Sequence, residues 1–257
     1  MSDILVLKIG GRVLGEETAA LDVVVTLHDS GHSLVVVHGG GPLATEWSGR
    51  LGLETRFVRG LRVTDAPTRD VALATLTGLA NARVVAGLIA RGVPAVGLSG
   101  IDGGMLRAER EEAELGLVGR VTLVDSGLLE ELLEAGRVPV IAPAALDKKD
   151  GEILNVNGDS AAGALAASLG ARLLVFVTDV PGVRSKDGKV IATLDAARAK
   201  TLVEDGTIEG GMVPKVEACL IAASAGCRCA IVAARGADAI ERLLDGEQVG
   251  TVFEAAA

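Results

Sequence analysis

Two lysines in this chain stand where a positive charge is costly unless it meets an anion. Lys8 falls near the carboxyl end of the apolar segment 4–9, which has the composition of a buried strand. Lys215 follows Pro214 in the first turn of a helix predicted over 212–226, where a cation opposes the helix dipole. Lys8 could instead extend its charged end to solvent along an apolar stem. Together they indicate a site for a phosphate or a carboxylate.

Three glycine-rich turns follow predicted strands. Glycines at the carboxyl ends of strands let backbone N–H groups approach anionic oxygens. One Gly-Gly pair is usually only a tight turn, but three such turns favour an anion site. The dinucleotide and P-loop fingerprints, G-x-G-x-x-G and G-x-x-x-x-G-K-[ST], are missing from the sequence. The turns are Lys8-Ile9-Gly10-Gly11, His38-Gly39-Gly40-Gly41 and Gly97-Leu98-Ser99-Gly100.

Two further segments carry groups that could bind carboxylates. The segment 155–159 (NVNGD) offers amide donors and the carboxylate of Asp159 just before a helix of small residues. Asp159 could equally be only the N-cap of that helix. Arg62 precedes the capping sequence Thr64-Asp65-Ala66-Pro67 and could pair with a carboxylate through two parallel N–H bonds. A single arginine is, however, more often a surface charge.

Short β-branched segments alternate with longer helical patterns along the chain. This alternation predicts an α/β fold, a three-layer αβα sandwich with a mainly parallel central sheet. The segment 104–124 is predicted to form hairpins instead of a helix. No repeat or linker is present, so any two lobes must share a sheet or a tight interface. The predicted strands are 4–9, 34–37, 95–98, 138–141, 173–177 and 229–232. The predicted helices are 16–30, 42–50, 66–91, 126–135, 159–169, 195–205, 212–226 and 237–245.

Composition excludes several classes of protein. With 49% hydrophobic residues among 257, the chain is not intrinsically disordered, and no apolar run approaches the roughly 18 residues of a membrane span. A net charge of −9 without basic clusters, and only 2% aromatic residues, predict no nucleic-acid partner. Three cysteines cannot all pair within the chain. Cys219, Cys227 and Cys229 are therefore predicted to be small buried residues of a cytoplasmic protein, and not zinc ligands.

Six ordered sequence blocks resemble the amino acid kinase family, most closely its acetylglutamate kinase branch. The resemblance extends almost from end to end, from the turn at 8–11 to the segment 250–253. It implies ATP-dependent phosphorylation of the side-chain carboxylate of N-acetyl-L-glutamate to an acyl phosphate, a step of arginine biosynthesis. The blocks are VVHGGG (36–41), GLRVTD (60–65), VGLSGIDG (96–103), LNVNGD (154–159), TDVPGV (178–183) and GGMVPKVEA (210–218).

The resemblance also implies a role for each matching position. Lys8 and Lys215 would stabilise the γ-phosphoryl group in transit, and Asp159 would hold both lysines without acting as a base. Mg²⁺ would arrive with ATP, and the protein would hold no metal of its own. The implied acetylglutamate-binding residues are Gly40, Gly41, Arg62 and Asn155. The implied nucleotide-binding residues are Gly10, Gly11, Thr178, Asp179, Val180, Gly182, Val183, Glu209, Gly210, Gly211 and Met212.

The resemblance implies a single domain over 1–257 that assembles as a homodimer. Residues 1–170 would form a lobe for substrate binding and dimerisation, and residues 171–257 an ATP-binding lobe. The predicted dimer interface is the helix 66–91, which is rich in small residues, although the same pattern suits an ordinary core helix. The small residues considered for the interface are Ala74, Gly78, Ala80, Ala82 and Ala86.

Two alternative functions stay open at this point. Some relatives phosphorylate aminoadipate or glutamate tethered to a small acidic carrier protein, which would suit positive charge around the substrate site. Five arginines cluster in this part of the sequence. A non-catalytic, nucleotide-binding member of the fold would be expected to lack Lys8, Lys215 or Asp159, and all three are present. The clustered arginines are Arg50, Arg56, Arg59, Arg62 and Arg69.

Overall fold

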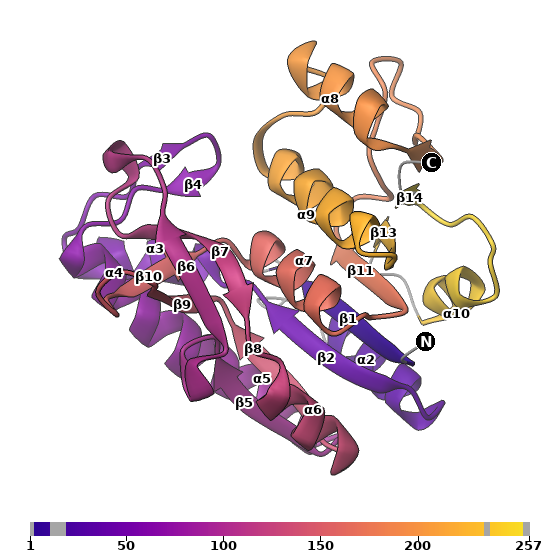
Figure 1. Cartoon of the computed structure of the whole chain (residues 1–257), viewed down its shortest axis with the longest axis horizontal. Helices are drawn as coiled ribbons and strands as arrows, with labels where there is room; N and C mark the ends of the chain where they lie inside the picture. The colour runs from indigo at the N-terminus through magenta and orange to yellow at the C-terminus, as the bar shows by residue number, and fades with distance from the viewer. Residues whose placement is uncertain (1–2, 11–18, 234–236, 254–257) are drawn as a thin grey trace.

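The central feature of the fold is one twisted, mainly parallel sheet (Figure 1). The computed structural model describes residues 3–10, 19–233 and 237–253. Within these residues the sheet has eight strands in the order β12-β14-β13-β11-β1-β2-β8-β5, and neighbours are parallel except for the antiparallel pair β13 and β14. The strands are β1 (Ile4–Ile9), β2 (Ser33–His38), β5 (Ala95–Ser99), β8 (Val138–Ala142), β11 (Leu173–Thr178), β12 (Thr193–Leu194), β13 (Arg228–Ala233) and β14 (Thr251–Phe253).

Helices cover both faces of the sheet and form the outer two layers. Alternate residues of the inner strands are buried on opposite faces, as the two-residue period of a strand requires. One face packs against α2 (Ala19–Asp29), α5 (Asn81–Ile89) and α10 (Asp238–Leu244). The other packs against α6 (Gly127–Glu134), α7 (Gly158–Ser168), α8 (Ala196–Glu204) and α9 (Val213–Ser224). The predicted αβα sandwich is therefore confirmed.

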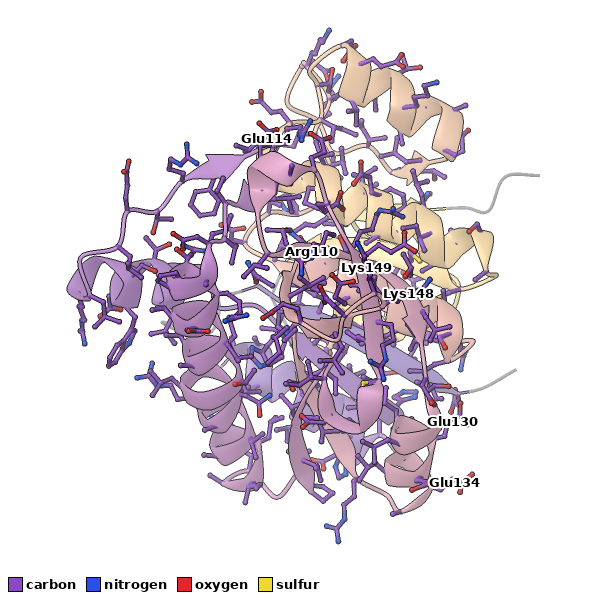
Figure 2. All side chains as sticks on the ribbon, turned by 60° about the vertical axis from the view of Figure 1, so that its left-hand side comes forward. Arg110, Glu114, Glu130, Glu134, Lys148 and Lys149 are labelled. Carbon is purple, nitrogen blue, oxygen red and sulfur yellow. The ribbon has the colours of Figure 1, made fainter. Side chains whose placement is uncertain are left out.

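A smaller β-layer lies beside the carboxyl edge of the main sheet. Strands β6 (Leu106–Arg110), β7 (Val118–Val124), β9 (Ala144–Asp147) and β10 (Ile153–Val156) close into a small barrel. The antiparallel pairing of β6 with β7 confirms the hairpin predicted within 104–124. Strands β9 and β10 were not predicted, because each has only four residues and neither shows a clear alternation. Figure 2 shows Arg110, Lys148 and Lys149 grouped on the outer side of this layer.

Every predicted strand and helix of the main sandwich is present, and the described ends agree within two residues. The predicted helix 66–91 is composite: α4 (Ala66–Leu73) continues through a π-helical segment (Ala74–Ala80) into α5. By length and composition alone, the helix Ala66–Ile89 is long and apolar enough to cross a membrane. Polar residues interrupt it, so the sequence contains no unbroken apolar run of that length. Val84 and Leu88 of this helix pack into the apolar core against the sheet.

The sheet is continuous across the predicted boundary at residue 170. Strand β1 pairs with β2 on one side and with β11 on the other, so segments from both predicted lobes meet at β1. The division into two lobes stays a prediction. Cys219 in α9, Cys229 in β13 and Cys227 in the connection between them are free and buried, which confirms them as small core residues.

Candidate active site

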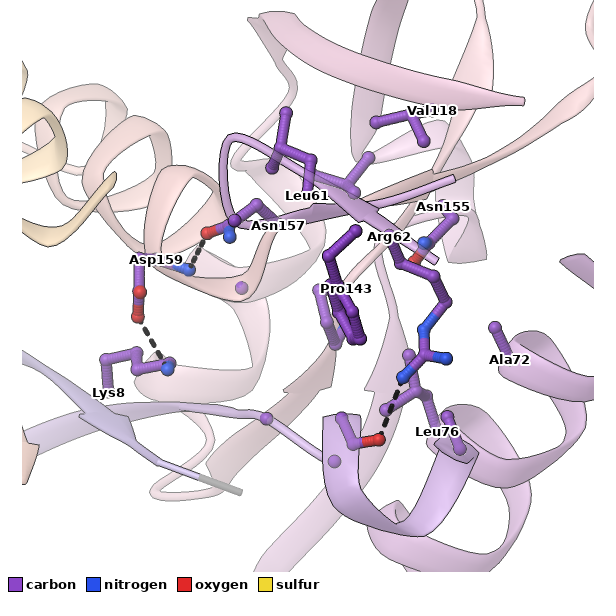
Figure 3. Close-up of a pocket in the computed structure, with 18 residues that line it drawn as sticks. Lys8, Leu61, Arg62, Ala72, Leu76, Val118, Pro143, Asn155, Asn157 and Asp159 are labelled. Atoms are coloured by element: carbon purple, nitrogen blue, oxygen red, sulfur yellow. Dashed lines mark hydrogen bonds and ion pairs between the residues drawn. The ribbon is translucent and has the colours of Figure 1, made fainter. Parts of the chain in front are cut away.

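A pocket opens where the carboxyl ends of β1 and β2 meet the start of α7. It encloses about 200 Å³. Figure 3 shows Lys8 and Asp159 on one side of it and Arg62 on the other. Ligands bind at this edge in open α/β sheets. Its lining comprises Lys8, Gly39, Gly40, Gly41, Ala44, Phe57, Gly60, Leu61, Arg62, Ala72, Leu76, Val118, Pro143 and Asn155 to Asp159.

One carboxylate joins the two lysines singled out from the sequence. The Nζ of Lys8 lies 2.5 Å from Asp159 Oδ1 in an ion pair. The Nζ of Lys215 donates to Asp159 Oδ2 at 2.8 Å and to the carbonyl of Gly211 at 3.1 Å. The structure therefore brings the three predicted catalytic residues together.

Asp159 is available to the lysines because another residue caps its helix. Asn157 is the N-cap of α7, and its Oδ1 accepts hydrogen bonds from the N–H groups of Asp159 and Ser160 at 2.7 and 3.2 Å. The alternative in which Asp159 is the N-cap is wrong. Asn157 was not among the predicted site residues, although an Asn two positions before a helical Asp is a recognisable capping signal.

Close packing of α7 on α9 sets the distance between Asp159 and Lys215. A β-carbon at Gly163 would lie 2.8 Å from the Ala218 carbonyl, so only glycine allows the two helices to approach this closely. Asp159 lies one turn before Gly163, and Lys215 lies one turn before Ala218. The small residues of the two helices thus bring a carboxylate and an ammonium group into contact.

The charges of this cluster shift one another's protonation equilibria. Burial lowers the pKa of Lys8, which is only 7% exposed; the neighbouring charge of Lys215 adds to the decrease, and Asp159 opposes it. Burial alone would raise the pKa of Asp159, but the two ammonium groups outweigh it and hold that pKa below its usual range. Asp159 is therefore ionised at neutral pH, with its charge facing the lysines.

Arg62 is buried. The alternative from the sequence, that a single arginine is a surface charge, is therefore wrong. Its guanidinium donates to the Gly41 carbonyl at 2.9 Å and to the hydroxyls of Thr45 and Thr55 at 2.8 and 3.3 Å. It also lies over the ring of Phe57. Burial lowers the pKa of Arg62, and no carboxylate of the described residues pairs with it. A buried cation with only neutral partners is suited to binding an anionic ligand.

Gly40, Gly41 and Asn155 line the same pocket as Arg62. Gly40 is the N-cap of α3 (Gly41–Arg50), and Asn155 Nδ2 donates to the Thr64 hydroxyl at 3.1 Å. A β-carbon at Gly40 would lie 2.5 Å from Leu76 Cδ2, so a side chain here would collide with the π-helical segment. The four predicted substrate-binding residues thus share one cavity.

Most of the predicted nucleotide-binding residues lie in two segments: one at the carboxyl end of β11 (178–183) and one just before α9 (209–212). The Thr178 hydroxyl donates to the Val180 carbonyl at 2.8 Å and accepts from the Val180 N–H. Gly182 and Val183 are buried: a β-carbon at Gly182 would lie 2.7 Å from Thr251 Oγ1, and that hydroxyl accepts from the Val183 N–H. Asp179, between Thr178 and Val180, is exposed. This turn is therefore anchored to β14.

The segment before α9 reaches toward the substrate pocket. Glu209 precedes the 3₁₀ turn Gly210–Met212, which leads directly into α9. A β-carbon at Gly60, in the turn of the hairpin β3 (Phe57–Val58) and β4 (Leu61–Arg62), would lie 3.5 Å from the Gly210 carbonyl. Gly10 follows β1 directly, whereas Gly11 lies outside the described residues.

The third glycine turn does not contribute to this pocket, contrary to the prediction from its position. The Ser99 N–H donates to Asp102 Oδ2 at 2.6 Å, and a β-carbon at Gly100 would lie 2.2 Å from the Ala144 carbonyl. These residues serve local packing. Strand β5 lies at the sheet edge, with β8 between it and β2, so its turn lies away from the pocket.

Comparison with known proteins identifies the family to which this chain belongs. A model of the amino acid kinase family matches residues 3–233, so the chain belongs to this family. An acetylglutamate kinase of Dehalococcoides mccartyi is 42% identical over 97% of this chain and 94% of its own length. One of Methanopyrus kandleri is 45% identical over 96% and 98%. A crystal structure of a Streptococcus mutans protein superposes over 100% of both chains with a TM-score of 0.85 and 27% identity.

Proposed function

We propose that this chain transfers the γ-phosphoryl group of ATP to the side-chain carboxylate of N-acetyl-L-glutamate. The observation that carries the proposal is the pocket with Arg62, a buried cation without a described carboxylate partner, on one side and Lys8 and Asp159 on the other (Figure 3). Asp159 also pairs with Lys215, which adds a second ammonium group beside this end of the pocket. Such a pocket suits a dicarboxylate, one end held by arginine and the other placed beside two lysines. The similarity to acetylglutamate kinases supports the same substrate.

The proposed mechanism depends on positioning and charge, and it needs no general base. A carboxylate acceptor with a pKa of about 4 is already ionised at neutral pH. Lys8 and Lys215 neutralise the charge that spreads over the phosphoryl oxygens during transfer. Asp159 stays ionised and fixes both ammonium groups, so the chain binds and orients the two anions without moving a proton.

We assign ATP to the turns around Thr178 to Val183 and Glu209 to Met212, with Gly10 and Gly11 donating backbone N–H groups. Among the described residues, no three or more His, Cys, Asp or Glu side chains gather as a metal site. We propose that Mg²⁺ enters with its nucleotide, as part of the MgATP substrate. The three free, buried cysteines are consistent with a cytoplasmic location, which belongs to the same proposal.

A product-trapping assay tests the function directly. The protein is incubated with MgATP, hydroxylamine and N-acetyl-L-glutamate, and the coloured hydroxamate formed from an acyl phosphate is measured. We expect signal with N-acetyl-L-glutamate and little with glutamate or aspartate. ATP binding without any hydroxamate would contradict the proposed substrate.

A carrier-tethered substrate is the second candidate, and the structure offers it little support. Arg50 pairs with Glu46, Arg59 with Glu112 and Glu114, and Arg69 with Asp70 and Glu152. Most of the arginines that cluster in sequence are therefore neutralised locally and do not form a positive surface for an acidic carrier. A non-catalytic role is disfavoured because Lys8, Asp159 and Lys215 are not only present but in mutual contact.

We propose a homodimer that buries the outer side of the helix 66–89. Ala74, Gly78, Ala82 and Ala86 are exposed along this side. Ala80 is buried, near the position that a β-carbon of Gly40 would occupy, and the structure removes it from the predicted interface. Small exposed residues let two helices approach closely.

The dimer predicts a specific response to one substitution. Light scattering of the wild-type protein at micromolar concentration should give twice the mass of one chain, and Gly78→Glu should reduce it to one. Nothing lies within 4 Å of a β-carbon at Gly78, so the change is tolerated within one chain. Gly49→Glu, on exposed α3 with equally open surroundings, is the matched control and should stay dimeric. A monomeric wild type would refute the dimer.

A further inference from the structure

A buried polar pair lies behind the glycine turn of the substrate pocket and is not explained by the proposed mechanism. His38 ends β2 and is fully buried, and Asn81 begins α5 directly after the π-helical segment. π-Helical turns are rare and are frequently found at functional sites. This one brings Leu76 into the pocket lining and Asn81 to His38.

Asn81 is fixed by groups from three strands. Its Nδ2 lies 2.8 Å from the Val140 carbonyl on β8, 3.2 Å from the Leu98 carbonyl on β5 and 3.1 Å from His38 Nε2 on β2. A β-carbon at Gly97 would lie 2.2 Å from Asn81 Oδ1, so the sheet leaves space for this amide. The side chain therefore has a single orientation, with its donor nitrogen toward the imidazole.

The contacts of His38 determine which of its nitrogens carries the proton. Its Nδ1 lies 2.8 Å from the Gly39 carbonyl, which can only accept, so Nδ1 is the donor. Nε2 then accepts from Asn81 Nδ2, whose two hydrogens are shared among His38 and the carbonyls of Val140 and Leu98. Burial lowers the pKa of His38; the hydrogen bond to Gly39 opposes this decrease and the charge of Lys8 adds to it. With its pKa below the usual value, the ring is neutral at neutral pH.

The hydrogen bond to Gly39 orients the peptide unit that enters the pocket. In a trans peptide the C=O and N–H groups point in opposite directions, so holding the Gly39 carbonyl toward His38 directs the Gly40 N–H away from it. Gly39 donates to the Ile9 carbonyl and the Gly40 carbonyl accepts from Ala44. Among the described residues, no group accepts from the Gly40 N–H, and Gly40 lines the pocket.

We infer that Asn81 and His38 are positioning residues that hold the Gly39–Gly40 peptide so that the Gly40 N–H donates to an anionic oxygen of bound N-acetyl-L-glutamate. The inference rests on the proposed function for its ligand. It explains why a neutral buried imidazole with a defined tautomer lies at the end of β2. Neither residue lines the pocket, so both act through the glycine turn.

Two substitutions at His38 distinguish the effect of its hydrogen bond to Gly39 from the effect of the space that its side chain fills. The amide nitrogen of His38→Asn occupies the place of Nδ1 and can donate to the Gly39 carbonyl, whereas that of His38→Gln takes the place of Nε2 and cannot. We expect His38→Asn to stay within about threefold of wild-type kcat/KM for N-acetyl-L-glutamate, and His38→Gln and Asn81→Ala to lose about 10- to 100-fold. KM for ATP should not change in any of them. Thr75→Val, which removes a buried hydroxyl bonded only to its own helix, is the control and should keep wild-type kinetics.

Nitrogen-15 NMR tests the same arrangement without any substrate. Wild-type His38 should give the ring pattern of a neutral imidazole protonated at Nδ1, and the Gly40 amide resonance should move in Asn81→Ala and His38→Gln but not in Thr75→Val. A proton on Nε2, or equal losses in the Asn and Gln variants of His38, would overturn the inference. A wild type that forms no hydroxamate but shows the expected ring pattern would instead contradict the proposed substrate.

Discussion

Replacing either lysine of the charged cluster with alanine is expected to lower kcat by about a hundredfold or more. In the proposed mechanism Lys8 and Lys215 contact the phosphoryl group when its charge is most widely spread, so their loss should raise the barrier and leave ground-state binding nearly intact. The loss should therefore appear in kcat, with KM for N-acetyl-L-glutamate changed far less. Steady-state hydroxamate formation at saturating MgATP measures both constants.

Controls must separate this loss from loss of structure. Each alanine variant leaves Asp159 with one of its two ammonium partners, so the carboxylate is still paired and the fold should persist. Thermal unfolding followed by circular dichroism checks this directly. Lys8→Met and Lys215→Met keep the length of the side chain and should show the same loss of kcat. Lys200→Ala, at an exposed position of α8, should behave as wild type. Undiminished turnover in a folded Lys8 or Lys215 variant would remove that residue from the mechanism.

The second large effect is expected at Arg62 and should appear in KM. Arg62→Ala removes a buried, charge-assisted contact worth about 1.5–3 kcal/mol, so KM for N-acetyl-L-glutamate should rise about 10- to 100-fold. Arg62→Lys keeps the charge but not the planar fork, so an intermediate increase is expected. KM for ATP should be unaffected. The exposed Arg56, which precedes the same hairpin, supplies the control Arg56→Ala.

The proposed function also predicts which carboxylate Arg62 binds. Lys8 and Arg62 lie on opposite sides of the pocket (Figure 3). With the reacting side-chain carboxylate beside Lys8, we expect Arg62 to bind the α-carboxylate. An analogue of N-acetyl-L-glutamate without the α-carboxylate should therefore be a poor substrate of the wild type. Its kcat/KM should fall little further in the Arg62→Ala variant. A further large loss with the analogue would show that Arg62 acts on another group.

Most elements of the main sandwich were predictable because their signal is local. Several of the predicted strands are apolar on both faces, and helices show their own spacing of apolar residues, so each pattern is visible within about ten residues. Short strands such as β9 and β10, and the π-helical turn inside 66–89, carry no such signal. Their form depends on the neighbours they pair with or pack against.

The sequence by itself determined which groups were available for chemistry: two lysines in costly positions, an aspartate at a helix start, an arginine and glycine turns at strand ends. Only the tertiary structure decided how they combine. It joined Asp159 to Lys215 through the close packing of α7 on α9 and placed Lys8 of β1 against the same carboxylate. It also buried Arg62 without a described carboxylate partner and excluded the turn at Gly100. The physical reason is that residue type sets charge and hydrogen-bonding capacity locally. Distances between groups more than fifty positions apart depend instead on strand order and on the space between packed helices.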